Sequence, residues 1–66
     1  MGFIKNWSPK VGEKVITTKN LSNFAGYMKK GSEVTVIGIG IRGYDIEDKE
    51  GNKILECGWD CIKQIK

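Results

Sequence analysis

Apolar and polar residues alternate along the central part of the chain with the period of two that is typical of β-strands. The longest such run covers residues 33–39, where Val34 and Val36 are expected to point to the same side of the strand. Residues 44–48 alternate in the same way, with Tyr44 directed inward and acidic residues directed outward. Both segments are therefore predicted strands.

Shorter apolar runs predict three further strands, at residues 11–18, 53–57 and 61–65. Between them, the sequence Asp-Lys-Glu-Gly-Asn at 48–52 predicts a hairpin turn with Gly51 in the left-handed region. Gly38 and Gly40 predict a bend or bulge near the end of the central strand. Residues 58–60 are long enough for a single 3₁₀-like turn before the last strand.

Residues 19–30 carry two conflicting patterns. Four apolar residues fall at helical spacing, namely Leu21, Phe24, Ala25 and Met28. Asparagine and glycine in the same segment favour turns instead. We therefore predict a long irregular loop with at most one helical turn, followed by a sharp turn at 31–32. Residues 1–10 are predicted to form an N-terminal arm, and residues 11–66 a single domain.

Composition supports a small all-β domain without catalytic machinery. Nine glycines and one proline in 66 residues, with more valine and isoleucine than leucine, favour strands and tight turns. A core of this size leaves little room for a deep pocket that excludes water. The sequence has no histidine, no nucleophile elbow and no phosphate-binding loop. We expect no enzymatic activity, no cofactor and no metal.

The order of these elements, with a long first loop and a tight hairpin, resembles that of SH3-like barrels. It is closer to the bacterial SH3 group than to the eukaryotic signalling domains. The resemblance is carried by residues 27–38, 43–46 and 58–62, and it extends over residues 11–65. It implies a five-stranded barrel with a long first loop and a 3₁₀ turn before the last strand. Because barrels of this kind bind many unrelated ligands, it implies a binding role without identifying the ligand.

Several features of the eukaryotic SH3 groove are missing. Residues 19–30 contain three lysines and no acidic residue that would meet a ligand arginine. Gly43 stands where the resemblance would place a ligand-stacking tryptophan, and Cys61 where it would place a tyrosine. Recognition of proline-rich peptides is therefore not expected. The bacterial group usually acts outside the cytoplasm, whereas this sequence shows no secretion signal, so we expect a cytoplasmic location.

Cys57 and Cys61 allow three interpretations. A zinc site would need two copies of the chain, because structural zinc takes four ligands. An intrachain disulfide is sterically acceptable but conflicts with a cytoplasmic location. The favoured interpretation is two reduced cysteines that act as small apolar residues.

Lysines concentrate in the first half of the chain and acidic residues from Asp45 onward, with a net charge of +3. Combined with nearby aromatic residues, this asymmetry defines eight candidate binding residues: Lys19, Phe24, Tyr27, Lys29, Lys30, Arg42, Tyr44 and Trp59. Trp59 has two interpretations, a side chain that closes the end of the core or one that faces a ligand.

The leading hypothesis is a protein-interaction module, such as a small accessory factor of a bacterium or a bacterial virus. The alternatives are nucleic-acid binding through the lysine-rich face and binding of cell-wall glycan. We expect no membrane partner, and a monomer or weak homodimer.

Overall fold

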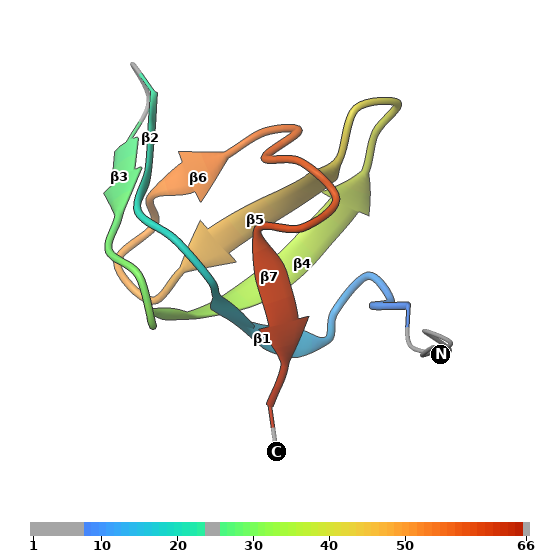
Figure 1. Ribbon diagram of the computed structural model, residues 1–66, viewed down its shortest axis with the longest axis horizontal. Coiled ribbons are helices and arrows are strands. Elements are labelled where there is room, and N and C mark those ends of the chain that lie inside the picture. Colours follow the sequence, from blue (N-terminus) through green and yellow to red (C-terminus); the bar gives the residue numbers. More distant parts are fainter. Residues whose placement is uncertain (1–7, 24–25, 66) are drawn as a thin grey trace, which may run out of the picture.

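The computed structural model describes residues 8–23 and 26–65, which form seven strands and no helix (Figure 1). The strands are β1 (Lys14–Thr17), β2 (Leu21–Asn23), β3 (Gly26–Met28), β4 (Glu33–Ile39), β5 (Tyr44–Asp48), β6 (Lys53–Ile54) and β7 (Ile62–Gln64). The all-β prediction is confirmed, and β4 and β5 have the bounds that the alternation predicts. The arm predicted at residues 1–10 lies largely outside the described residues.

The strands form two antiparallel sheets. A five-stranded sheet has the order β6-β5-β4-β1-β7, and β2 pairs with β3 in a separate two-stranded sheet. The small sheet lies against β6 (Figure 1). The described strands do not close into one continuous barrel, so of the five-stranded barrel prediction only the antiparallel all-β architecture is shown.

The core is built from the inward-facing positions of this alternation. Eight apolar side chains are buried in one cluster: Val15, Met28, Val34, Val36, Ile46, Ile54, Cys61 and Ile62. Val34 and Val36 share one face of β4, as predicted. Tyr44 packs partly against the same cluster, so its ring lies at the border between core and surface.

A bulge in β4 determines which way the side chains point at one end of the large sheet. Val36 lies opposite Ile46, but the next pairs are Gly38 with Asp45 and Ile39 with Tyr44. One residue of β4 is thus left without a partner on β5, which confirms the bulge predicted at the glycines. Because directly opposed residues point to the same face of a sheet, the shift places Ile39 beside Tyr44.

Within the segment 19–30, residues 21–23 and 26–28 pair as strands β2 and β3, so the predicted irregular loop is wrong. Leu21 lies opposite Met28 in this hairpin. Buried Thr17 connects it to the large sheet: its hydroxyl donates to the Lys29 carbonyl at 2.9 Å and accepts from the Ser32 N–H at 3.0 Å. The sharp turn predicted at 31–32 is confirmed.

The β5–β6 hairpin agrees with its prediction. Gly51 has a φ of 90°, and Asp48 holds the turn by accepting from the Glu50 and Asn52 N–H groups and from the Asn52 amide. The hydrogen bond from the Asn52 side chain, followed by those from the backbone, lowers the pKa of Asp48 below its ordinary value of 3.8.

The returning strand is shorter than the predicted 53–57. Glu56 has a φ of 50°, and its N–H leaves the sheet to donate to the Asp45 carboxylate at 2.8 Å. The predicted 3₁₀ turn at 58–60 is also wrong. Residues 59–61 form bends instead, and the φ of 117° at Gly58 does not fit a right-handed helical turn.

Candidate functional site

An exposed aromatic pair stands at the end of the sheet where the bulge lies. The rings of Tyr44 and Trp59 meet edge to face, with centroids 5.0 Å apart and planes at 85°. Tyr44 is half-buried against the core, whereas Trp59 is 55% exposed. Trp59 therefore does not close the core. It presents most of an indole to the surroundings, supported from one side by Tyr44.

A contact between two glycines places Trp59 beside Tyr44. A Cβ atom added to Gly43 would lie 2.1 Å from the backbone nitrogen of Gly58, so any side chain at position 43 would force the two segments apart. At this contact the Tyr44 N–H donates to the Gly58 carbonyl at 3.4 Å, and the Cys57 N–H donates to the Tyr44 carbonyl at 2.9 Å. Gly43, expected from the resemblance to mark a missing aromatic residue, thus lets the turn carrying Trp59 approach β5.

The far side of the Trp59 turn is held by the residues that follow β1. The Thr18 N–H donates to the Cys61 carbonyl at 2.8 Å, and the Thr18 hydroxyl donates to the Asp60 carbonyl at 2.8 Å. The Lys19 ammonium pairs with the Asp60 carboxylate at 3.4 Å. Lys19, a predicted binding residue, therefore lies at the edge of the Trp59 turn and takes part in a surface ion pair.

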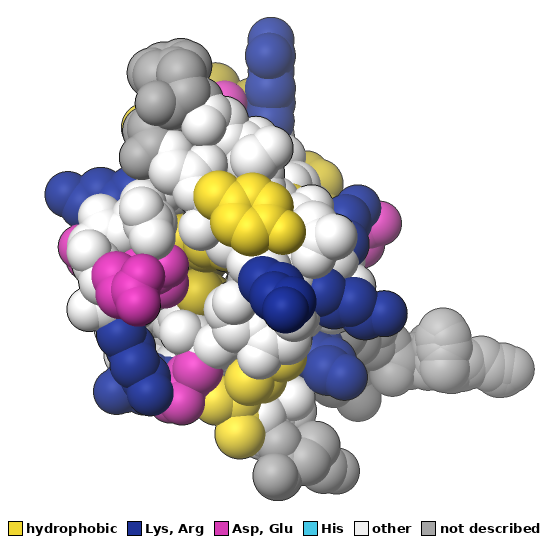
Figure 2. Space-filling model, turned by 90° about the vertical axis from the view of Figure 1, so that its left-hand side faces the viewer, with side chains coloured by type: hydrophobic (Ala, Val, Ile, Leu, Met, Phe, Trp, Pro, Cys, Tyr) yellow, Lys and Arg dark blue, Asp and Glu magenta, His cyan; other side chains and the backbone are white. Residues whose placement is uncertain are grey.

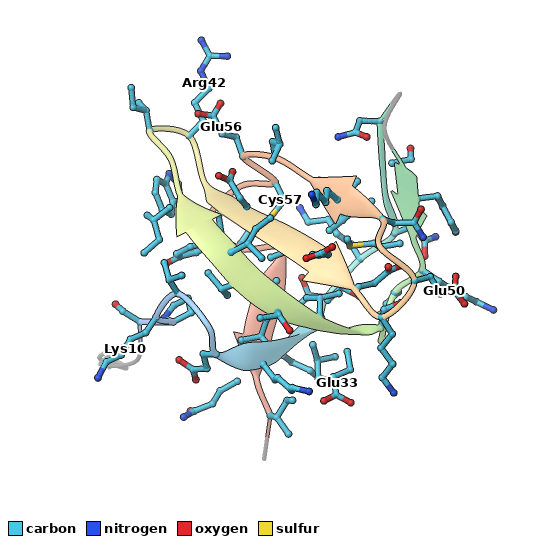
Figure 3. The ribbon with its side chains drawn as sticks, turned by 180° about the vertical axis from the view of Figure 1, so that it is seen from behind. Lys10, Glu33, Arg42, Glu50, Glu56 and Cys57 are labelled. Carbon is cyan, nitrogen blue, oxygen red and sulfur yellow. A yellow bond between two sulfur atoms is a disulfide. The ribbon has the colours of Figure 1, made fainter. Side chains whose placement is uncertain are left out.

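A disulfide between Cys57 and Cys61 closes this turn, so the prediction of reduced cysteines is wrong. The bend at 59–61 brings the two Cα atoms to 6.3 Å, within the range that a disulfide spans. The spacing in the sequence was compatible with this bridge, and only the expected cytoplasmic location argued against it. Cys61 is buried in the core, and the partly buried Cys57 packs against it (Figure 3).

Two further exposed apolar side chains lie at the same end of the molecule as the pair. Ile39, opposite Tyr44, is 54% exposed, and Ile41 in the β4–β5 loop is 90% exposed. That loop lies at the same end of the molecule as the segment 55–61 (Figure 1). We call Ile39, Ile41, Tyr44 and Trp59 the aromatic patch. Single exposed apolar residues are ordinary, but several gathered at one end of a small domain mark a contact surface.

Charged side chains stand around the aromatic patch. Arg42 projects from the tip of the β4–β5 loop, and Glu56 lies close to it (Figure 3). Polar groups also remain within the patch, because neither the Trp59 indole N–H nor the Tyr44 hydroxyl has a hydrogen-bond partner in the part of the chain that the structure describes. The patch thus combines apolar area with two polar groups that a ligand can engage.

The structure divides the eight predicted binding residues into two groups. Arg42, Tyr44 and Trp59 belong to the aromatic patch or its rim, with Lys19 beside the Trp59 turn. Tyr27, Lys29 and Lys30 lie elsewhere, on the β2–β3 hairpin and the turn that follows it. Phe24 lies outside the described residues. Sequence reasoning missed Ile39 and Ile41, although an isoleucine in a glycine-flanked loop is a signal of exposed apolar surface.

Within residues 8–23 and 26–65, no three His, Cys, Asp or Glu side chains are grouped as metal ligands would be. The same residues contain no helix with the length and apolar character needed to cross a membrane.

Comparison with protein-family models, with curated proteins and with solved structures yields no match to this chain. The SH3-like resemblance therefore stays a prediction from the order of the elements and from residues 27–38, 43–46 and 58–62.

Proposed function

We propose that this chain is a non-catalytic binding module that docks an apolar segment of a partner protein on the aromatic patch. The observation that carries the proposal is the exposed indole of Trp59, fixed edge to face against Tyr44. Tryptophan and tyrosine are enriched among the residues that dominate protein–protein binding energy. A rigid ring loses little conformational freedom when a partner covers it, so more of the contact energy is retained.

The surroundings of the patch support a protein ligand. Protein interfaces combine an apolar centre with a polar rim, and here Arg42 and the Lys19–Asp60 ion pair flank the aromatic residues. The Trp59 N–H and Tyr44 hydroxyl can bond to the backbone of an extended segment. A proline-rich ligand with an arginine anchor has less support, because residues 19–30 offer no carboxylate to receive it.

The order of the strands supports an SH3-like relationship as part of this proposal. A long excursion between β1 and β4, here the β2–β3 hairpin, and a tight β5–β6 hairpin are the features on which it rests. We keep the assignment to a bacterial or phage accessory factor as a prediction. The cytoplasmic location has lost support, because disulfides such as Cys57–Cys61 persist mainly in oxidising compartments. An oxidising location favours the cell-wall alternative, which binding to purified peptidoglycan would test.

The proposal can be tested by site-specific photocrosslinking. A benzophenone amino acid at Ile41, in the patch, is compared with the same group at Lys53, an exposed position on β6. We expect a protein adduct that forms from position 41, is absent from position 53 and disappears when Trp59→Ala is added. An adduct that forms equally from both positions, or that survives Trp59→Ala, would contradict the proposal. A crosslink to a second copy of the chain would show that the aromatic patch mediates self-association and does not bind a different protein.

A further inference from the structure

A second surface lies on the opposite side of the fold from the β4–β5 loop. The β3–β4 turn and the β5–β6 hairpin enclose an open hollow of ≈ 370 Å³ between Tyr27 and Lys29 on one side and residues 48–52 on the other. Its volume falls within the range of small-ligand sites. Figure 2 shows this face, with a hydrophobic side chain near its centre, basic side chains beside and below it, and an acidic side chain across the hollow.

We propose that this hollow binds a nucleotide of a single-stranded nucleic acid, with the base against Tyr27 and the backbone phosphates on Lys29 and Lys30. The inference is independent of the aromatic patch. It rests on three features that the structure brings together: an exposed ring on a braced hairpin, cations next to it in the sequence, and carboxylates in the lining of the hollow.

The Tyr27 ring is available for stacking. Tyr27 is 54% exposed, and no other aromatic ring contacts it among the described residues. Its strand is braced, because a Cβ on Gly26 would lie only 3.0 Å from the Asn52 Cβ, which shows how closely β3 packs on the β5–β6 hairpin. A rigid, exposed tyrosine is the element on which single-stranded nucleic acids stack their bases, whereas the bases of a duplex are already stacked.

Charges on the two sides of the hollow fit the two parts of a nucleotide. Lys29 and Lys30 are exposed, and their ammonium groups make no ion pair within the described part of the chain. Three carboxylates, those of Glu33, Asp48 and Glu50, also line the hollow, together with the ammonium group of Lys49. Asp48 is engaged in its own turn, whereas Glu33 and Glu50 pair with no lysine of the described residues. Lysines suit phosphates, and carboxylates accept from amino groups of bases such as cytosine N4.

The arrangement favours a nucleic acid over an acidic peptide. Glu33 and Glu50 repel phosphates and acidic side chains alike, so the distinction comes from the exposed Tyr27 ring, on which a base can stack and an acidic side chain cannot. A nucleotide uses both walls, because its base donates hydrogen bonds and its phosphate is anionic.

Fluorescence anisotropy with a labelled single strand of about 12 nucleotides tests the inference, at salt concentrations from about 50 to about 200 mM. We expect salt-dependent binding that Tyr27→Ala weakens about 5- to 150-fold and that Tyr27→Phe preserves, since phenylalanine keeps the stacking face. Lys29→Glu and Lys30→Glu should each reduce the slope of log K against log salt by about 0.7. Lys53→Glu makes the same charge change outside the hollow and should leave this slope unchanged.

Several results would overturn the inference: no binding at the lowest salt concentration, an equal loss with Lys53→Glu, full affinity with Tyr27→Ala, or tighter binding of polyglutamate than of the oligonucleotide. Trp59→Ala should leave oligonucleotide binding intact. A negative result for nucleic-acid binding can therefore be told apart from a negative result for protein binding at the aromatic patch.

Discussion

Substituting Gly43 by alanine should separate the two segments that create the aromatic patch. The added methyl carbon would lie 2.1 Å from the Gly58 nitrogen and 2.5 Å from its Cα, and both of these are backbone atoms that no rotamer change can move. The turn carrying Trp59 must therefore move away from β5 by about 1 Å or more, since core atoms pack at about 3.5–4.0 Å.

The cost can be estimated from what the movement disrupts. Overpacking of this kind costs about 1–3 kcal/mol, and loss of the Tyr44–Gly58 hydrogen bond adds about 0.5–1.5 kcal/mol. The sum, about 1.5–4.5 kcal/mol, is comparable to the total of about 3–5 kcal/mol expected for a core of this size. Gly43→Ala should thus leave a domain that is barely folded at room temperature.

Urea denaturation followed by far-ultraviolet circular dichroism measures this loss. With a slope of about 1 kcal/mol per molar urea, the midpoint should fall by about 1.5–4.5 M. Gly12→Ala is the matched control. Gly43 has a positive φ of 156° and Gly12 one of 97°, but nothing lies within 4 Å of a Cβ added to Gly12. The free energy of unfolding of Gly12→Ala should fall only by the cost of placing alanine in the left-handed region, about 1–2 kcal/mol. If Gly43→Ala is no less stable than Gly12→Ala and retains the near-ultraviolet signal of the aromatic pair, then the Gly43–Gly58 contact does not have this role.

Three further substitutions or conditions test other parts of the fold. Thr17→Val keeps the shape of the side chain but removes its two hydrogen bonds to the β3–β4 turn, so the free energy of unfolding should fall by about 1–3 kcal/mol in urea titrations; a change below about 0.5 kcal/mol would contradict this role. The Asn52 side chain lowers the pKa of Asp48 in the folded state. The ionised Asp48 carboxylate therefore stabilises the fold above its ordinary pKa of 3.8, and this stabilisation is lost as the pH falls below that value. The stability difference between the wild type and Asp48→Asn should therefore shrink below about pH 4, and a difference independent of pH would contradict it. Reducing the Cys57–Cys61 disulfide, which closes a ring of five residues, should cost about 2 kcal/mol, whereas a Cys57→Ala/Cys61→Ala variant should be insensitive to reductant; unchanged midpoints with the thiols shown to be free would count against the bridge.

The large sheet was predictable because local pattern and tertiary structure agree there. Alternation in residues 33–39 and 44–48 specifies which side chains are buried, and Gly51 favours the hairpin that joins β5 to β6. The segment 19–30 was not predictable in the same way. Leu21 and Met28 are seven residues apart, which matches one face of a helix, but they are also directly opposed in the β2–β3 hairpin. Spacing alone does not distinguish these arrangements.

The candidate site depends on contacts between distant residues. Tyr44 and Trp59 were among the predicted binding residues, but their edge-to-face contact requires the approach of Gly43 to Gly58, which no local pattern encodes. Ile39 joined the site only because the bulge in β4 changed its direction.

The central claim is that the aromatic patch binds a partner protein through Trp59. Its most direct test is the affinity of the purified crosslinked partner for the wild type and for Trp59→Ala, measured by isothermal titration calorimetry. The control is Ile65→Ala, which removes an exposed apolar side chain beyond the far end of β7. A residue that dominates binding contributes about 2 kcal/mol or more, so Trp59→Ala should weaken binding about 30-fold while Ile65→Ala changes it less than about twofold. Equal affinities for the wild type and Trp59→Ala would contradict the claim.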